Sequence, residues 1–324
     1  MLAPGTTAWV LTDGKAGDEV QCLGLTEALG IVAEPRRVRP RAPFAFLSPW
    51  GPVDPAQAPG RPGSPLAPPY PSLAVASGRR AVPYLRALRR LSRGRTYTVF
   101  LKDPRTGSRT ADLVWVPEHD RLRGPNVLVT PTPPHRVSAG RLEQARLHPD
   151  PRLAALPRPR VAVLAGGPSR HHRFTGADVA RLAAGLARVA DEASLMVTLS
   201  RRTPRELGQA LAVLCRAPRH FLWDGTGDNP YLALLALADA VVVTADSYNM
   251  VGEAVATGAP VLVFEPEGGH PKLGRFLESL RRHGAVKPFT GHLEAFTYEP
   301  LDSTPIIAAA VAEGLARHRR AHPI

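Results

Sequence analysis

Cysteine is almost absent from this chain: only Cys22 and Cys215 occur among 324 residues. They lie far apart in segments that we expect to be helical, so neither a disulfide framework nor a cysteine metal site is expected. No apolar run reaches the roughly 20 residues of a membrane span, and the first residues lack the layout of a signal peptide. These absences favour a cytoplasmic protein, at most peripheral to a membrane.

Acidic residues are also scarce: 28 Asp and Glu against 41 Lys and Arg give a formal charge of +13. Residues 1–150 carry 21 basic and 12 acidic side chains, and residues 151–324 carry 20 and 16. A basic surface suits nucleotide sugars, anionic lipid headgroups or nucleic acid. We recognise no nucleic-acid-binding module, so nucleic acid is not an expected partner. The abundance of Arg, Pro and Ala is also what a genomic base bias produces.

The most informative stretch runs from Thr244 to Phe264. A β-branched run leads to a turn at Asp246 and Ser247, then apolar residues recur at helical spacing, and a stop at Gly258 precedes a second apolar run. This pattern predicts a parallel βαβ unit. The helix begins where a strand ends, which is where open α/β sheets bind ligands and where a helix dipole favours an anion. We therefore expect an anion or nucleotide site, and interpret Asp246 as an N-cap or turn residue.

The strand–loop–helix plan recurs along the chain. Further strands are expected at residues 8–12, 73–77, 96–101, 112–116, 126–130, 161–165, 194–200 and 221–224. Glycine-containing loops follow several of them, and such loops are typical ligand contacts in α/β folds. In the first loop, Lys15 fits a phosphate or acidic-substrate contact and equally a solvated turn residue. Arg79 and Arg80 open a predicted helix, where cations oppose the dipole, and so indicate either a nearby anion or a solvated pair.

Glu118, His119 and Asp120 are the best acid–base candidates in the first half. Neighbouring side chains point in different directions, so at most one or two of the three can enter one site. The alternative is structural: His119 or Asp120 would hold the loop at residues 121–123 in place.

In the second half, Gly166 and Gly167 open a loop that also carries Ser, Arg and His residues. Glycines permit close backbone approach, and these side chains can donate to phosphate, so the loop indicates a diphosphate site. A metal site at the adjacent histidines of this loop is not expected, because no carboxylate or Cys lies at ligand spacing. Residues 203–206 have the pattern of a capping box, which leaves Arg201 or Arg202 for a ligand. Asn229 is interpreted as the N-cap of the helix that follows it.

Two domains are expected, at residues 1–150 and 151–324, with an Arg- and Pro-rich linker at 139–160. The last helix, at about 305–319, could cross back onto the first domain. Residues 40–71 form a Pro- and Gly-rich insertion that begins with an apolar cluster of Phe44, Phe46, Leu47 and Trp50. We expect this cluster to pack on its domain, with contact to a membrane or an acceptor lipid as the alternative.

Several stretches together resemble one family. They are TDGKAGDEVQCLGLTEALG, VPEHDRLRGPNVLVT, GGPSRHHRF, LSRRTP, GHPKLGRF and the segment from DNPYLALLALADAVVV to SYNMVGEAVATGAPV. The resemblance, to the mitochondrial-fission "elongated mitochondria" (ELM) family with its many bacterial members, covers nearly the whole chain except residues 40–71. It implies a GT-B-like fold, that is, two Rossmann-like α/β domains facing a central cleft. Nucleotide-sugar glycosyltransferases and UDP-sugar epimerases share that fold.

The resemblance also implies roles. Ser247, Tyr248 and Asn249 would donate to phosphate and Glu253 would bind the ribose, while the first domain would hold the acceptor. Asp18 stands where the family pattern leads us to expect a histidine. The hypothesis is a glycosyltransferase-like protein that uses a nucleotide-diphosphate sugar without metal or cofactor, with Asp18, Glu118 or His119 as base. The sequence does not identify the acceptor, for which a saccharide and a lipid-linked molecule are the options. The alternative functions are a non-catalytic adaptor at a membrane surface and a nucleotide-sugar epimerase. The expected binding residues are Gly14, Lys15, Gly166, Gly167, Ser169, Arg170, Arg201, Asn229, Ser247, Tyr248, Asn249, Glu253 and His270.

Overall fold

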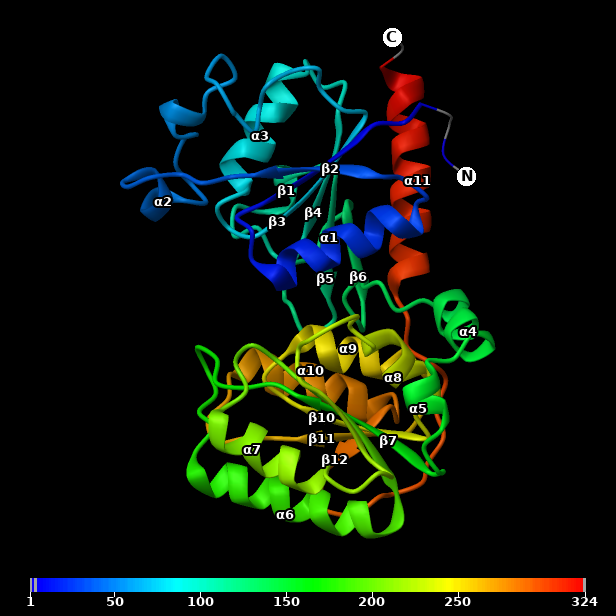
Figure 1. Ribbon diagram of the computed structural model, residues 1–324. Coiled ribbons are helices and arrows are strands. Elements are labelled where there is room, and N and C mark those ends of the chain that lie inside the picture. Colours follow the sequence, from blue (N-terminus) through cyan, green and yellow to red (C-terminus); the bar gives the residue numbers. More distant parts are fainter. Residues whose placement is uncertain (1, 3–4, 323–324) are drawn as a thin grey trace. The chain divides into compact units, whose positions relative to one another are not determined.

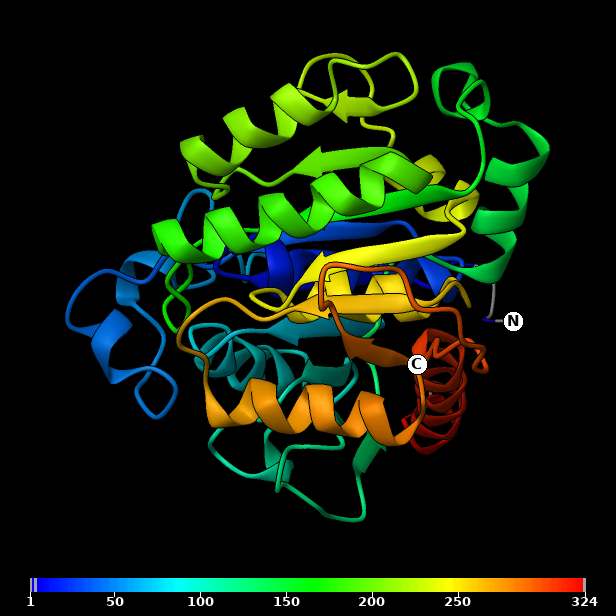
Figure 2. The same cartoon turned by 90° about the horizontal axis from the view of Figure 1, so that it is seen from below.

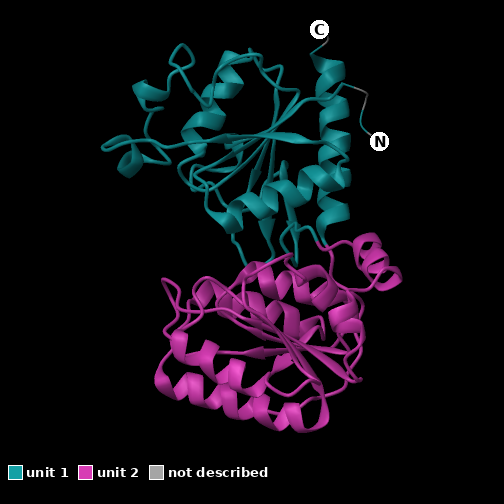
Figure 3. Ribbon diagram, in the orientation of Figure 1, with its two compact units in different colours: residues 1–136, 303–324 teal, residues 137–302 magenta. Residues whose placement is uncertain are grey.

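The computed structural model describes residues 2 and 5–322, so part of the N-terminal segment discussed above lies outside the described residues. The chain divides into two compact units (Figure 3). Unit 1 comprises residues 1–136 and 303–324, and unit 2 comprises residues 137–302. The chain therefore enters unit 2 once and returns to unit 1 for its last segment.

Unit 1 is a parallel sheet with helices (Figure 1). Its elements are β1 (Ala8–Thr12), α1 (Ala16–Ala28), β2 (Ala33–Arg37), α2 (Phe44–Leu47), β3 (Leu73–Ser77), α3 (Val82–Leu91), β4 (Tyr97–Leu101), β5 (Leu113–Pro117), β6 (Val127–Thr130) and α11 (Thr304–Ala321). Short 3-10 turns lie at Pro55–Gln57 and Ser108–Thr110. The strand order is β2-β1-β3-β4-β5-β6. The order reverses between β1 and β3, and ligands of such sheets bind outside the strand ends at that switch point.

Unit 2 has the same layered build (Figure 2). Its elements are α4 (Ala139–Leu147), α5 (Pro151–Ala154), β7 (Arg160–Ala165), α6 (Gly176–Glu192), β8 (Ser194–Leu199), α7 (Arg205–Leu214), β9 (Phe221–Trp223), α8 (Tyr231–Leu237), β10 (Ala240–Thr244), α9 (Tyr248–Val255), β11 (Val261–Phe264), α10 (Pro271–Arg282) and β12 (Val286–Pro288). The order β12-β11-β10-β7-β8-β9 is the doubly wound arrangement of dinucleotide-binding sheets, with its switch point between β7 and β10.

Burial of both sheet faces explains why the central strands are continuous apolar runs. Every residue of β1, β3, β4 and β10 is buried. Each unit has two apolar clusters made of alternate strand residues, one for each face of its sheet. Parallel sheets covered on both sides have this composition, and all ten strands expected from the sequence are present. The two strands that we did not predict, β2 and β12, are edge strands with charged residues or proline in them.

The domain boundary differs from the expected one at residue 150. The segment interpreted as a linker contains α4 and α5, and both pack on α8 of unit 2. Leu142 and Leu153 are buried in that cluster, so the boundary falls at residues 136 and 137. The final helix α11 packs on α1, β4 and β5 of unit 1, where Ile307 and Val311 are buried.

The insertion at residues 40–71 is packed on unit 1 at its base. Asp54 is fully buried and accepts hydrogen bonds from the backbone N–H and guanidinium of Arg41 and from the N–H of Ala56. Gln57 accepts from the Tyr84 hydroxyl, and Leu66 is buried in the core of unit 1. The expected packing of the apolar cluster is wrong: Phe46, Leu47 and Trp50 are 76%, 49% and 65% exposed, and Phe44 is half-buried.

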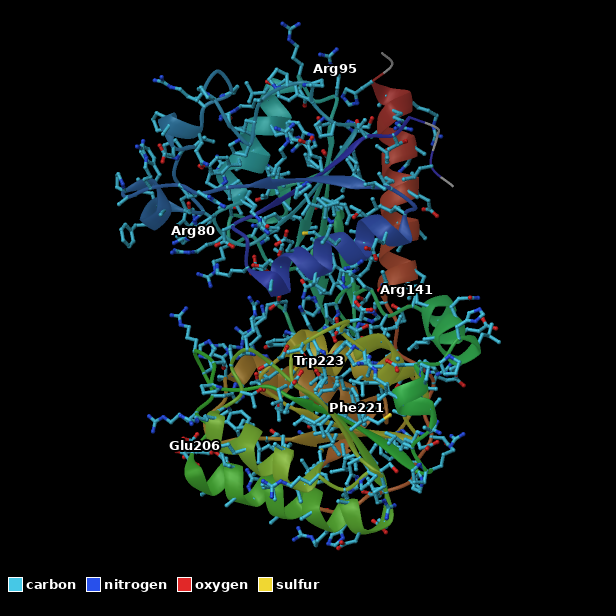
Figure 4. The ribbon with its side chains drawn as sticks, in the orientation of Figure 1. Arg80, Arg95, Arg141, Glu206, Phe221 and Trp223 are labelled. Carbon is cyan, nitrogen blue, oxygen red and sulfur yellow. The ribbon has the colours of Figure 1, made fainter. Side chains whose placement is uncertain are left out.

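The expected capping box at residues 203–206 is also wrong. Helix α7 begins at Arg205 without a side-chain cap. Instead, the Thr203 hydroxyl donates to the carbonyl of Ala165 and accepts from the N–H of Ser200. Thr203 is structural, but it joins the ends of β7 and β8 instead of starting a helix. Glu206, labelled in Figure 4, lies in the first turn of α7.

Candidate functional site

Asp246 is the centre of the unit 2 switch point. Its carboxylate accepts from the Thr244 hydroxyl (2.7 Å), the Gly167 N–H (3.2 Å) and the Arg202 guanidinium (2.7 Å). The side chain of Asp246 is fully buried, whereas that of Arg202 is 45% exposed. Because these partners come from the ends of three neighbouring strands, the carboxylate fixes the loops after β7, β8 and β10 against one another.

Of the two roles expected for Asp246, N-cap or turn residue, the structure shows the turn. The N-cap position of α9 belongs to Ser247, whose hydroxyl accepts from the N–H of Met250. The buried Asp246 side chain therefore holds the loops together, while the Ser247 hydroxyl caps the helix. The helix α9 still begins at the switch point, where its dipole favours an anion.

Gly166 and Gly167 are required by internal packing. A Cβ on Gly166 would overlap the Asp246 carboxylate, and one on Gly167 would overlap the backbone carbonyl of Arg202. Their N–H groups are also engaged, Gly166 by the Thr244 hydroxyl (2.8 Å) and Gly167 by Asp246. The close approach predicted for these glycines is thus made to the protein itself, and any ligand must be bound by other groups of the loop.

The remainder of this loop is connected to the loop after β11. The Ser169 hydroxyl accepts from the N–H groups of His171 and His172 and lies 3.1 Å from Nδ1 of His172. Residues His172 and Gly268 form an antiparallel bridge. The rings of His171 and His270 are in contact, with centroids 4.4 Å apart and planes tilted by 44°. Hydroxyl and imidazole groups from two loops thereby meet at one side of the switch point.

Cationic groups crowd this side of unit 2. The pKa of His270 is lowered, first by loss of hydration and then by the positive charge of His171, Arg275, Lys272 and Arg170. The pKa of buried His172 is also lowered, mainly by burial. Arg170, His171 and His270 are exposed. Arginine and imidazole donors gathered at strand-end loops are suited to binding an anion.

Glu253 lies in α9, six residues after the N-cap Ser247, and is buried. Burial raises the pKa of Glu253 to about 7, although the hydrogen bond donated by the Tyr231 hydroxyl to Oε2 (2.6 Å) acts in the opposite direction. The other oxygen, Oε1, makes no hydrogen bond with the described residues. Tyr231 was not singled out from the sequence, because a tyrosine 22 residues away gives no local signal.

Asp18 occupies the corresponding place in unit 1. Its Oδ1 accepts from the Ser77 hydroxyl at the end of β3 (3.0 Å) and from Lys102 after β4 (2.5 Å). Burial opposes ionisation of Asp18, but Lys102 and Ser77 outweigh it, so the pKa is lowered. Lys102 is the first residue after β4. Its backbone is left-handed (φ 78), a conformation that is uncommon for residues other than glycine.

A second carboxylate, Asp13, lies beside Asp18. Lys15 pairs with its Oδ2 (2.7 Å), and Arg80 lies 3.8 Å from the same oxygen. Its Oδ1 is buried and has no hydrogen-bond partner among the described residues. A Cβ on Gly78 (φ 89) would meet Asp18 at 3.1 Å and Asp13 at 3.7 Å, so the glycine makes room for both carboxylates. The sequence suggested that Arg80 lies near an anion. Within unit 1, the carboxylate of Asp13 is that anion.

The acid–base candidates Glu118, His119 and Asp120 lie in the loop that follows β5. His119 and Asp120 are buried. Arg123 donates to the backbone carbonyls of Glu118, Asp120 and Leu122. Arg123 therefore helps to hold the loop through its backbone carbonyls. The structural alternative, in which His119 or Asp120 holds residues 121–123 in place, stays a prediction.

Some of the expected binding residues lie together at the unit 2 switch point, and others lie elsewhere in the two units. Ser169, His270 and Ser247 belong to loops joined at the unit 2 switch point, and Arg170 and the exposed Arg201 lie on the same loops. Tyr248 and Asn249 form the first turn of α9. Asn229 accepts from the Tyr231 N–H (3.0 Å) at the start of α8. In unit 1, Gly14 (φ 81) donates to the Thr12 hydroxyl in the loop after β1.

Residues 2 and 5–322 hold no cluster of three or more His, Cys, Asp or Glu suited to a metal ion. None of the helices in that part of the chain combines the length and apolar character needed to cross a bilayer. Both cysteines are unpaired thiols, and burial raises the pKa of each.

Sequence comparison identifies the family. The family model described as "Mitochondrial fission ELM1" matches residues 16–315. The chain belongs to this ELM1 family. The mitochondrial fission protein ELM1 of Arabidopsis thaliana is 32% identical over 275 residues, which cover 76% of this chain and 64% of that protein. An uncharacterized protein of Rickettsia prowazekii is 29% identical over 162 residues, or 47% of this chain and 45% of that protein. The chain thus spans less than two thirds of the length of these ELM1-family relatives.

Solved structures confirm the fold class. UDP-GlcNAc 2-epimerase from Neisseria meningitidis, solved bound to UDP-GlcNAc, matches with a TM-score of 0.54 and 11% identity, over 96% of this chain and 100% of that chain. The corresponding enzyme of Methanocaldococcus jannaschii matches with a TM-score of 0.52 and 10% identity, over 95% and 99%. At this identity the likeness shows the fold alone: the ELM1-family chain has two Rossmann-like units of the GT-B type.

Proposed function

We propose that unit 2 of this ELM1-family protein binds a nucleotide-diphosphate sugar and that the protein transfers the sugar to a hydroxyl acceptor. The observation that carries the proposal is the crowding of Arg170, His171 and His270 beside the N-terminus of α9 at the unit 2 switch point. A diphosphate supplies the negative charge that these groups lack. Glu253, with Oε1 uncommitted, is suited to accept from a ribose hydroxyl.

In the proposed reaction, the acceptor hydroxyl oxygen forms a bond to the anomeric carbon while the bond from that carbon to the diphosphate oxygen breaks. The nucleoside diphosphate leaves with the electron pair and is stabilised by the arginines and the helix terminus. The hydroxyl proton passes to a group of unit 1. Asp18, Glu118 and His119 remain the proposed bases, and Asp18 is held ionised by Lys102.

Calorimetric titration with UDP, GDP and ADP, and with their sugars, tests the binding step. The double variant Arg170→Ala/Arg201→Ala should lose about tenfold in affinity per arginine that contacts phosphate. The matched control is Arg205→Ala/Arg216→Ala, which removes two exposed arginines elsewhere in unit 2. No binding of any nucleotide at millimolar concentration, or equal loss in both double variants, would overturn the proposal.

A non-catalytic adaptor on the same fold is the second candidate function. It is favoured by the internal use of Gly166, Gly167 and Arg202, whose donors are spent on Asp246, Thr244 and backbone carbonyls. An adaptor would show no nucleotide-dependent property. A thermal shift of the protein by UDP, ADP or GDP contradicts the adaptor, and its absence in parallel with the titration supports it.

A nucleotide-sugar epimerase is separated from a transferase by the products. An epimerase converts the sugar while it remains on the nucleotide and needs no acceptor. Incubation with a nucleotide sugar that binds, followed by chromatography, should yield free nucleoside diphosphate only when an acceptor is added. A new nucleotide sugar formed without an acceptor would replace the transferase proposal by the epimerase.

A further inference from the structure

The tip of the 40–71 insertion carries three exposed apolar side chains. Phe46 and Leu47 lie on the short helix α2, and Trp50 lies in the turn that follows it. In unit 1, α2 lies on the opposite side from α11 (Figure 1). Exposed aromatic side chains gathered on one short segment are unusual on a water-facing surface and mark interaction sites.

The insertion presents these side chains from a firmly held base. The buried carboxylate of Asp54 binds Arg41 and Ala56, the Ser64 hydroxyl donates to the carbonyl of Gln57, and Arg79 donates to the carbonyl of Ser48. Such a base keeps the apolar tip from folding back onto unit 1. The exposure of Trp50 is therefore a property of the fold of the insertion.

Arginines lie directly beside the apolar tip. Trp50 lines a surface hollow of about 670 Å³ together with Arg86, Arg105, Thr106, Arg109 and Thr110. The three guanidinium groups are exposed, and none of them pairs with a carboxylate of the residues that the structure describes. The hollow is an open depression of the surface, and its three arginines are suited to the phosphates of lipid headgroups.

The sequence around the tip is also strongly basic. Residues 36–109 contain 15 basic and only 2 acidic side chains. One of the two carboxylates, Asp54, is already neutralised by Arg41. This segment accordingly carries an excess positive charge larger than that of all of unit 2, and a long-range field of this sign attracts anionic surfaces.

We propose that Phe46, Leu47 and Trp50, with Arg86, Arg105 and Arg109, form a docking surface for an anionic lipid bilayer. A bilayer offers an apolar layer next to a layer of phosphates, so it satisfies the tip and the arginines at once. An RNA strand would supply phosphates and stacking partners for the aromatic rings, but no apolar partner for Leu47. The proposal is independent of the nucleotide site in unit 2.

Co-sedimentation with vesicles tests this surface. The full-length protein should pellet with vesicles of phosphatidylcholine and phosphatidylglycerol at low salt, should be released as salt rises, and should ignore pure phosphatidylcholine. Arg86→Gln/Arg105→Gln/Arg109→Gln should weaken binding about fivefold per arginine. Phe46→Ser/Trp50→Ser should weaken it about tenfold or more. The charge-matched control Arg205→Gln/Arg216→Gln/Arg282→Gln should bind within about twofold of the original protein.

Tryptophan fluorescence locates the contact. Of the four tryptophans, Trp9 and Trp115 are buried and Trp223 is half-buried, so Trp50 is the most exposed reporter. Anionic vesicles should shift the emission to shorter wavelength, and Trp50→Phe should remove the shift while binding persists. The proposal is overturned if anionic vesicles do not bind, if the control triple variant loses as much as the Arg86 set, or if the Phe46/Trp50 variant loses binding to an oligoribonucleotide but not to vesicles.

Discussion

The switch point of each unit contains a carboxylate, a hydroxyl and a cationic side chain, but the carboxylate oxygens left without a hydrogen bond differ between the two units. In unit 1, Asp18 accepts from a hydroxyl, Ser77, and a cation, Lys102. In unit 2, Asp246 accepts from Thr244 and Arg202 and also from a backbone N–H. Both Asp246 oxygens accept hydrogen bonds. Within the described part of the chain, by contrast, Asp18 accepts only through Oδ1, and the buried Oδ1 of its neighbour Asp13 has no partner.

This difference assigns different tasks to the two carboxylates. Asp246 holds three loops together, and the neighbouring Arg170, His171 and His270 are the groups that we propose to bind an anion. Asp18 and Asp13 retain acceptor capacity in unit 1, which suits a ligand rich in hydroxyl groups. If the comparison is right, disrupting the contacts of Asp246 in unit 2 costs more stability than disrupting those of Asp18 in unit 1.

The largest effect is expected from Gly167→Ala. The new Cβ would overlap the backbone carbonyl of Arg202, so the loops after β7 and β8 must separate, at a cost of roughly 3 kcal/mol. Gly176→Ala is the matched control, because nothing lies within 4 Å of a Cβ at that helix start, and it should change stability by less than about 0.5 kcal/mol. Urea unfolding of both variants measures this. Equal stabilities would mean that the close packing around Asp246 is not restrictive.

Glu253→Gln should stabilise the protein at high pH. The folded pKa of about 7 lies above the ordinary 4.5, so Glu253 destabilises the folded state progressively as pH rises from about 4.5 through 7. The glutamine variant should therefore be more stable than the original by up to roughly 3 kcal/mol at pH 8, with the difference shrinking towards pH 5. Thermal unfolding at the two pH values measures it, and a gain that is the same at both would contradict the raised pKa.

Asp18→Asn should cost less, about 1 to 2 kcal/mol at neutral pH, because Lys102 can be solvated when its partner is lost. Asp246→Asn should cost more, since it disrupts three loops. Because the pKa of Asp18 is lowered in the folded state, ionised Asp18 stabilises the fold above the unfolded pKa of about 3.8. This stabilisation is lost as pH falls further. The cost of Asp18→Asn, measured by urea unfolding, should therefore shrink as pH falls below about 3.8. A cost at pH 7 equal to or above that of Asp246→Asn would reverse the comparison.

The sequence predicted elements with strong local patterns and missed features that depend on partners far along the chain. Buried strands such as Leu73–Ser77 are continuous apolar runs, so they were predictable. The edge strand Ala33–Arg37 has charged residues and a proline, and only its pairing with β1 makes it a strand. Thr203 matched a capping pattern, yet its hydroxyl is claimed by Ala165, 38 residues away.

The candidate site followed the same rule. The loops were predictable because strand ends of parallel sheets carry ligand-binding loops. The central role of Asp246 was not, because its partners Gly167 and Arg202 lie 79 and 44 residues away. Burial statistics for aromatic residues predicted a packed Trp50, but the firmly held base of the insertion keeps that side chain in solvent.

A crystal structure grown with a nucleotide-diphosphate sugar tests the central claim most directly. The account predicts a diphosphate beside Arg170 and His270 at the first turn of α9, with a ribose hydroxyl donating to Glu253 Oε1 and with the Asp246–Arg202 pair intact. A well-ordered structure at millimolar ligand in which the nucleotide binds elsewhere, or in which Asp246 and Arg202 separate to receive it, would contradict the account.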